Sequence, residues 1–287
     1  MRGLRDLDGL SASRRHIYSV VHMLVPAFAT LGRLAMTDDL TCPKAVGLIG
    51  FGAFGRLIAQ HLAPLIQLRA YDEAVKPLEI SQINNLRFVS VIEAANCPVV
   101  ILAVPVNRME ETVRVISPHL KPGSLVLDVG SVKVAPADIM QRGLPPHVDV
   151  IATHPLFGPQ SAVGGIRGLK IAVCPIRGTR FRRVVAFLRM LGLEVIVTTP
   201  DEHDREAATV QGLTHLIAKV LVQMEPLPTR MTTRSFDLLM QAIGMVRDDA
   251  PEVFQAIESV NPHSREVRRQ FFDLAARLNA KLENGSS

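Results

Sequence analysis

The chain has 287 residues, of which 48% are hydrophobic, so it can bury one large or two ordinary cores, and the disordered class is excluded. Its 32 basic and 27 acidic residues give a net charge of +5. Because the arginines are interleaved with acids, we expect a solvated surface and no nucleic-acid-binding stripe.

The cysteines and the hydropathy of the chain indicate the cellular compartment and test for a metal site or a membrane span. Cys42, Cys97 and Cys174 are isolated and lack metal-ligand spacing, which is typical of reduced thiols in a cytoplasmic protein without a metal site. No apolar run reaches the roughly 18 residues that a membrane span requires. We therefore expect a globular protein of the cytoplasm.

Residues 1–42 are interpreted as an extension, flexible or loosely helical, that precedes the fold. The stretch 17–32 superficially resembles the apolar region of a signal peptide, but His22 and Pro26 interrupt it. Met36 is an alternative start, and we expect no further domain at either end.

A short apolar run at 44–49 leads into the glycine-rich sequence GFGAFG and then into a helical pattern. This is the context that the dinucleotide fingerprint requires, because the free amides and positive end of a helix hold a pyrophosphate. We expect Gly50 to make the turn, Gly52 to let the backbone approach the phosphates, and Gly55 to allow close packing. The predicted cofactor contacts in this loop are Gly50, Phe51, Gly52, Ala53, Phe54 and Gly55. A glycine-turned strand and helix that bind nothing is the plain alternative.

The next predicted strand, 65–72, ends at Asp72, close to the expected offset of about 20 residues from the glycine loop. A carboxylate at this position can bond the ribose hydroxyls and would repel a 2′-phosphate. The sequence therefore predicts NAD in preference to NADP.

Strand and helix patterns alternate after Asp72. Apolar runs at 98–105, 124–130, 147–154, 169–175 and 193–199 predict further strands of a doubly wound, parallel sheet with right-handed crossovers. This α/β pattern defines a predicted Rossmann domain over residues 43–199.

The pattern becomes wholly helical at Thr199-Pro200-Asp201-Glu202, which has the form of a capping box that starts a long helix. We expect a last helix from Asn261-Pro262. Its apolar positions are spaced by three and four residues, namely Val267, Phe271, Leu274, Leu278 and Leu282. A helical domain over 200–287 with so much apolar surface predicts burial against a second subunit, that is, a homodimer.

Polar side chains follow three predicted strands, at the sheet edge where ligands bind in such folds. Val104 and Pro105 are expected to wall the nicotinamide, and Ser131 with Lys133 offers a hydroxyl and a cation. His154 precedes a rigid loop, PLFGP, and its ordinary pKa near 6.5 suits a general base in alcohol dehydrogenation.

The long helix carries Asp204, Gln211 and His215 at spacings of seven and four, which puts them on one helix face. This face is either a wall of the cleft or a buried hydrogen-bond network.

Together, GLIGFGAFG, DVGSVK, HPLFGP and EHDREAATVQGLTH resemble the prephenate/arogenate dehydrogenase family of tyrosine biosynthesis, over roughly residues 44–280. The resemblance implies a Rossmann domain joined to a helical dimerisation domain, with the active site in the cleft between them. It also implies NAD-dependent hydride removal coupled to loss of the ring carboxylate, with no metal. By the same resemblance His154 would deprotonate the ring hydroxyl, Ser131 would orient it, and His215, Gln211 and His203 would bind the substrate.

The chain departs from the family where prephenate-specific members carry an arginine, since Gly244-Met245 stands there. Arg230, Arg234 and Arg247 are nearby candidates. Without such an arginine the resemblance favours arogenate or both substrates. Asp248 or Asp249 would suit the ammonium of arogenate, with surface capping as the alternative role of these two residues.

Two other functions stay open at this point. One is a β-hydroxyacid type of dehydrogenase, in which a helix-borne lysine such as Lys219 is catalytic. The other is a non-catalytic NAD-sensing protein, which an intact set of Ser131, His154 and His215 argues against.

Overall fold

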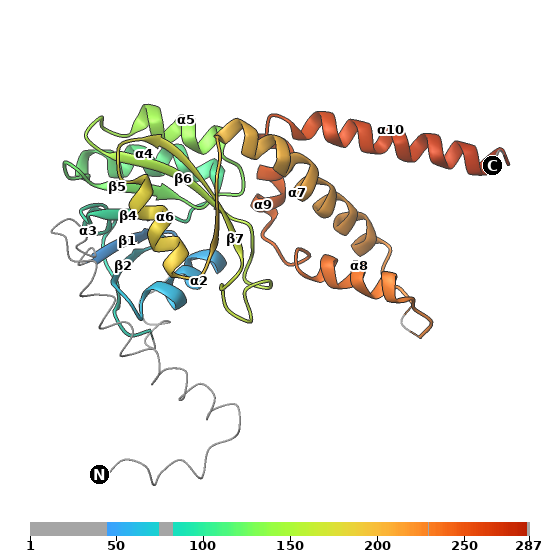
Figure 1. The fold of residues 1–287 in the computed structure, drawn as a ribbon, viewed down its shortest axis with the longest axis horizontal. Helices are drawn as coiled ribbons and strands as arrows, with labels where there is room; N and C mark the ends of the chain where they lie inside the picture. The colour runs from blue at the N-terminus through green and yellow to red at the C-terminus, as the bar shows by residue number, and fades with distance from the viewer. Residues whose placement is uncertain (1–44, 75–82, 229, 286–287) are drawn as a thin grey trace, which may run out of the picture. The chain divides into compact units, whose positions relative to one another are not determined.

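A computed structural model describes residues 45–74, 83–228 and 230–285, all within one compact unit (Figure 1). The predicted extension over 1–42 lies outside these described residues. Within them, no helix is both long enough and apolar enough to cross a membrane.

An eight-stranded sheet forms the first half, in the order β3-β2-β1-β4-β5-β6-β7-β8. The strands are β1 (Ala45–Ile49), β2 (Gln67–Tyr71), β3 (Leu86–Phe88), β4 (Val99–Leu102), β5 (Leu125–Asp128), β6 (Asp149–Pro155), β7 (Lys170–Arg177) and β8 (Glu194–Val197). All neighbours are parallel except β6 and β7. The predicted doubly wound sheet is therefore confirmed.

Two features of the sheet differ from the prediction. The edge strand β3 has only three residues, none of them buried, so it leaves no apolar run in the sequence. Strand β7 is antiparallel because residues 156–169 contain no helix, and a parallel return needs a crossover that is usually helical.

Helices cover both faces of the sheet (Figure 1). They are α2 (Ala53–Leu62), α3 (Val91–Ala95), α4 (Met109–Ile116), α5 (Val134–Gly143) and α6 (Phe181–Met190), with short 3-10 turns η2 (Val106–Arg108) and η3 (Ser117–His119). One core cluster packs α3, α4 and α5 against the sheet, and a second packs α2 and α6 against the other face. Alternate residues of β1 enter alternate clusters, as a strand buried on both faces requires.

The second half is helical, as predicted. Its elements are α7 (Pro200–Gln223), α8 (Arg234–Gly244), α9 (Pro251–Gln255), a π-helical turn η4 (Ala256–Val260) and α10 (Ser264–Glu283). Helix α7 packs on α8, η4 and α10, and it also contacts α5 of the sheet half. It is thus the element that joins the two halves.

The starts of two helices differ in detail from the prediction. At α7, Thr199 accepts the amide of Glu202 at 3.3 Å, but Glu202 accepts the hydroxyl of Thr198, so only half of the capping box forms. Helix α10 begins at Ser264, two residues after Pro262. Asn261 lies before it, where its Oδ1 accepts the amide of His263 at 2.9 Å and its Nδ2 donates to the carbonyl of Asp204 at 2.7 Å.

Candidate active site

The glycine loop between β1 and α2 has the geometry that the sequence predicts. Gly50 has φ +97°, and a Cβ there would lie 2.3 Å from the carbonyl oxygen of Ala103. A Cβ on Gly55 would lie 2.3 Å from the carbonyl oxygen of Gly50, so both positions require glycine. Gly52 differs, since no atom lies within 4 Å of its Cβ position and no side chain caps α2 there. The open helix N-terminus fits a pyrophosphate.

The carboxylate of Asp72 accepts hydrogen bonds from the glycine loop and from the residues that follow β2. The amide of Phe51 donates to Oδ2 of Asp72 at 2.6 Å, and the amide of Ala74 donates to Oδ1 at 2.8 Å. The ring of Phe51 is fully buried and meets Phe88 edge-on, with 5.0 Å between centroids. The amide of Phe51 is thus bonded to Asp72 and its ring is buried, so Phe51 holds the loop in shape. Gly52 and Ala53 are exposed.

A pocket of about 250 Å³ opens beside this loop, and its lining includes Gly50, Asp72, Val104 and Pro105. Val104 and Pro105 were expected to wall the nicotinamide. They line the same pocket as Asp72, the carboxylate expected to hold a ribose, because β4 lies directly beside β1. Their contact with the nicotinamide stays a prediction.

Two aromatic rings bring the start of α2 close to the loop that follows His154. Phe54, in the first turn of α2, lies 6.2 Å between ring centroids from Phe157, three residues after His154. A dinucleotide bound at the N-terminus of α2 would therefore extend toward the end of β6.

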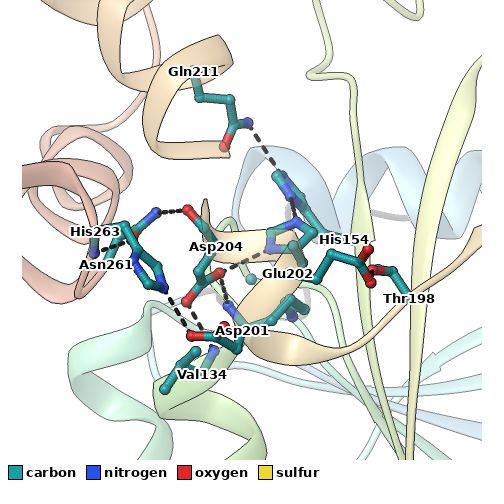
Figure 2. Close-up of polar contacts among 12 residues, drawn as sticks. Val134, His154, Thr198, Asp201, Glu202, Asp204, Gln211, Asn261 and His263 are labelled. Atoms are coloured by element: carbon teal, nitrogen blue, oxygen red, sulfur yellow. Dashed lines mark hydrogen bonds and ion pairs between the residues drawn. The ribbon is translucent and has the colours of Figure 1, made fainter. Parts of the chain in front are cut away.

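His154 lies at the end of β6 and is 4% exposed. Its Nδ1 is 2.8 Å from Nε2 of His203, and its Nε2 is 3.3 Å from Nε2 of Gln211 (Figure 2). Burial lowers the pKa of His154 well below its ordinary value of 6.5, and the positive charge that His203 carries when protonated, like that of Lys133, lowers it further. His154 is therefore a neutral imidazole, ready to accept a proton at neutral pH.

His203 and Asp204 lie behind this imidazole, in the first turns of α7. Nδ1 of His203 is 2.8 Å from Oδ1 of Asp204, which is fully buried. The same carboxylate accepts the amides of Lys133 at 2.6 Å and Val134 at 2.9 Å, at the N-terminus of α5 (Figure 2). His203, expected to bind the substrate, thus contacts His154 and a buried carboxylate.

Gln211 and His215 lie on the next turns of α7. Nδ1 of His215 is 2.9 Å from the carbonyl oxygen of Gln211, and its Nε2 is 3.2 Å from Oδ2 of Asp249. Oδ1 of Asp249 also lies 3.6 Å from the Cβ position of Gly158, in the loop after His154. An acid from the segment before α9 therefore lies beside both α7 and the loop that follows His154.

Lys133 does not offer its charge to the cleft, contrary to expectation. Its Nζ forms a fully buried ion pair with Asp128 and donates to the carbonyl of Thr153 at 2.6 Å. Asp128 attracts the side chain inward because a buried carboxylate needs a partner. Ser131 makes no side-chain hydrogen bond within the described residues, so its hydroxyl stays available to a ligand.

None of the three arginines considered for the substrate carboxylate is buried. Arg230 and Arg234 are exposed, and Arg247 pairs with Glu225 at 2.9 Å. Lys219, the residue that the β-hydroxyacid alternative needs, lies over the ring of Phe254, 5.5 Å from its centroid. That alternative gains no support from the geometry.

The family model described as "Prephenate dehydrogenase, nucleotide-binding domain" matches residues 73–197, from the residue after Asp72 to the end of β8. A "Probable arogenate/prephenate dehydrogenase" of Methanocaldococcus jannaschii is 30% identical over 205 residues, covering 67% of this chain and 46% of the relative. "Arogenate dehydrogenase 1, chloroplastic" of Arabidopsis thaliana is 26% identical over 254 residues, covering 83% and 39%. The chain thus spans about half the length, or less, of these relatives.

Solved structures share the fold. Prephenate dehydrogenase from Aquifex aeolicus, solved with hydroxyphenyl propionate and NAD+, superposes with a TM-score of 0.67 at 20% identity, covering 87% of this chain and 93% of that one. Synechocystis arogenate dehydrogenase gives a TM-score of 0.61 at 19% identity, covering 84% and 92%. At such identities the likeness concerns the fold alone.

Proposed function

We propose that the chain, whose residues 73–197 match the prephenate dehydrogenase nucleotide-binding model, is a member of the prephenate/arogenate dehydrogenase family and catalyses the oxidative decarboxylation of prephenate, arogenate or both, with NAD. The products would be 4-hydroxyphenylpyruvate or tyrosine. The observation that carries the proposal is His154, a buried neutral imidazole at the sheet edge, beside an open helix N-terminus that fits a pyrophosphate.

NAD would accept the hydride from the ring carbon that bears the hydroxyl. The protein's own residues would bind, orient and deprotonate. Gly52, Ala53 and Phe54 would hold the pyrophosphate by their amides, and Asp72 the adenosine ribose. Nε2 of His154 would take the hydroxyl proton, and Ser131 would orient that hydroxyl. Because aromatisation favours the products, orientation and charge stabilisation are the main tasks.

The segment before α9 supports a preference for arogenate. Prephenate presents a keto acid in its side chain, whereas arogenate presents an ammonium beside a carboxylate. Asp249 is an acid at the cleft, next to His215, and Arg247 of the same segment is paired elsewhere. A carboxylate without a competing cation from this segment suits the ammonium.

The direct test incubates the pure protein with NAD and each substrate, and follows the absorbance of the reduced cofactor. We expect turnover with at least one substrate, with higher kcat/KM for NAD than for NADP. His154→Asn is the matched control: it should bind NAD normally and lose about two to four powers of ten in kcat. NAD binding without turnover of either substrate would refute the proposal and favour the NAD-sensing alternative.

We also propose a homodimer formed through residues 200–287. The apolar stripe of α10 stays open to solvent in the single chain, with Leu274, Leu278 and Leu282 exposed by 52%, 60% and 73%. An obligate interface of this kind buries over about 2,000 Å². Light scattering tests it: we expect a dimer at micromolar concentration, dissociated by Leu278→Glu, and an active monomeric wild type would contradict it. We further propose a cytoplasmic location, because isolated cysteines are typical of reduced thiols in that compartment.

A further inference from the structure

Three side chains from α7 and β6 form a linear chain of hydrogen bonds that ends at the catalytic imidazole. Oδ1 of Asp204 is 2.8 Å from Nδ1 of His203, and Nε2 of His203 is 2.8 Å from Nδ1 of His154. The exposed fractions are 0%, 6% and 4%, so water competes little for these contacts. The chain contains only one group that cannot donate, the carboxylate at its start.

When both imidazoles are neutral, that carboxylate fixes the position of every proton in the chain. An ionised carboxylate accepts only, so Nδ1 of His203 must carry a proton and donate it. In a neutral imidazole the other nitrogen then has the lone pair, so Nε2 of His203 accepts from Nδ1–H of His154. The lone pair of His154 is thereby left on Nε2.

The far end of the chain agrees with this order. Nε2 of His154 faces the amide nitrogen of Gln211 at 3.3 Å, and an amide NH2 donates to a lone pair. In that orientation the Oε1 of Gln211 is buried without a donor. With His203 neutral, the opposite tautomer of His154 would set two lone pairs against each other at 2.8 Å.

We propose that Asp204 and His203 are positioning residues that hold His154 as the Nδ1–H tautomer, so that Nε2 is the base. The hydroxyl proton then moves to Nε2 of His154, while Nδ1–H keeps donating to His203 and the resulting positive charge faces the Asp204 carboxylate through it. The kinetic part of this inference rests on the proposed dehydrogenase function, and the tautomer itself does not.

Asp204 also couples this orientation to the docking of the two halves. Its carboxylate accepts the amides of Lys133 and Val134 at the N-terminus of α5, where the helix dipole favours an anion. One side chain of α7 therefore binds the sheet half and starts the chain that ends at His154. The base is correctly oriented only where α7 is seated on α5.

The tautomer is measured directly by long-range ¹H–¹⁵N correlation NMR on protein with ¹⁵N-labelled histidine, with His154 assigned through His154→Asn. We expect Nδ1–H on His154 in the wild type and loss of this preference in His203→Phe, which keeps a ring but offers no acceptor. His61, whose Nδ1 lies 3.0 Å from the carbonyl oxygen of Leu57, is the internal control and should not change. An Nε2–H tautomer in the wild type, or an unaltered His154 in His203→Phe, would overturn the inference.

Kinetics separates positioning from mere stability. His203→Phe should lower kcat by roughly 10- to 1000-fold, below the ~10⁴-fold loss seen when the orienting acid of a catalytic triad is replaced, and leave the Kd for NAD unchanged. His203→Gln supplies an amide oxygen for His154 and an NH2 for Asp204, so it should recover both the tautomer and much of kcat. Equal losses in both variants would mean that His203 acts only structurally. If the wild type turns over neither substrate but shows the expected tautomer, the proposed function fails and the orientation stands.

Discussion

Two glycines of the nucleotide loop should respond in opposite ways to the same substitution. A Cβ on Gly55 would lie 2.3 Å from the carbonyl oxygen and 3.1 Å from the carbonyl carbon of Gly50. Both are backbone atoms, so the turn itself must retreat by about 0.7 Å to reach the 3.0 Å below which Cβ contacts are essentially never found. A Cβ on Gly52 would meet nothing within 4 Å, and its φ of −66° suits any residue.

The magnitudes follow from these contacts. Overpacking of a rigid site costs about 1–3 kcal/mol, and replacing glycine by alanine returns about 0.4–1 kcal/mol through the unfolded chain. At the middle of each range the net cost is about 1.3 kcal/mol, so Gly55→Ala should lower Tm by roughly 3–5 °C, at about 2–4 °C per kcal/mol for a domain of this size. Gly52→Ala should change the free energy of unfolding by less than about 1 kcal/mol. Its methyl group would stand where the pyrophosphate approaches, so NAD affinity should fall about 10- to 100-fold, or about 1.4–2.7 kcal/mol.

The assay pairs thermal unfolding with calorimetric titration of NAD into each variant. Wild-type affinity in Gly52→Ala would show that the pyrophosphate is held elsewhere than at the N-terminus of α2. A Gly55→Ala protein as stable as the wild type would refute the argument from close approach.

Three further changes test the site. Because burial lowers the pKa of His154, the folded state binds fewer protons than the unfolded state below about pH 6.5. The free energy of unfolding from urea titrations should then drop by up to about 1.4 kcal/mol per pH unit below that pH, with the slope reduced in His154→Asn. An identical pH dependence in the two proteins would count against a buried neutral His154, and the acid limb of kcat should likewise lie below pH 6.5. Lys133→Met leaves the Asp128 carboxylate buried without its cation, so it should cost about 3–5 kcal/mol; a loss under about 1 kcal/mol in the same titrations would contradict the pairing. Asp249→Asn should lower kcat/KM for arogenate about tenfold relative to prephenate, or about 1.4 kcal/mol, and an unchanged ratio would remove Asp249 from substrate choice.

The sequence by itself determined the features whose physical cause is local. Gly50 needs a positive φ, and Gly55 needs to lack a Cβ, so the loop is encoded by residue type at fixed spacing. Strands buried on both faces appear as continuous apolar runs, and the change to helix at Thr199 is marked by a cap and a proline. His154 was identifiable because it ends such a strand, at the edge where ligands bind.

Only the tertiary structure decided which polar groups meet. His154 and His203 are 49 positions apart, and the only sequence sign of their contact was the polar pair His203-Asp204 in the first turns of a helix. Lys133 could have faced the cleft, but the buried Asp128 draws it inward. Strand β7 reverses because the segment before it contains no crossover helix. The spacing of apolar residues indicates which face of each element is buried. Which charges and imidazoles pair depends on how α7 packs against α5 and β6, and no local sequence pattern encodes that packing.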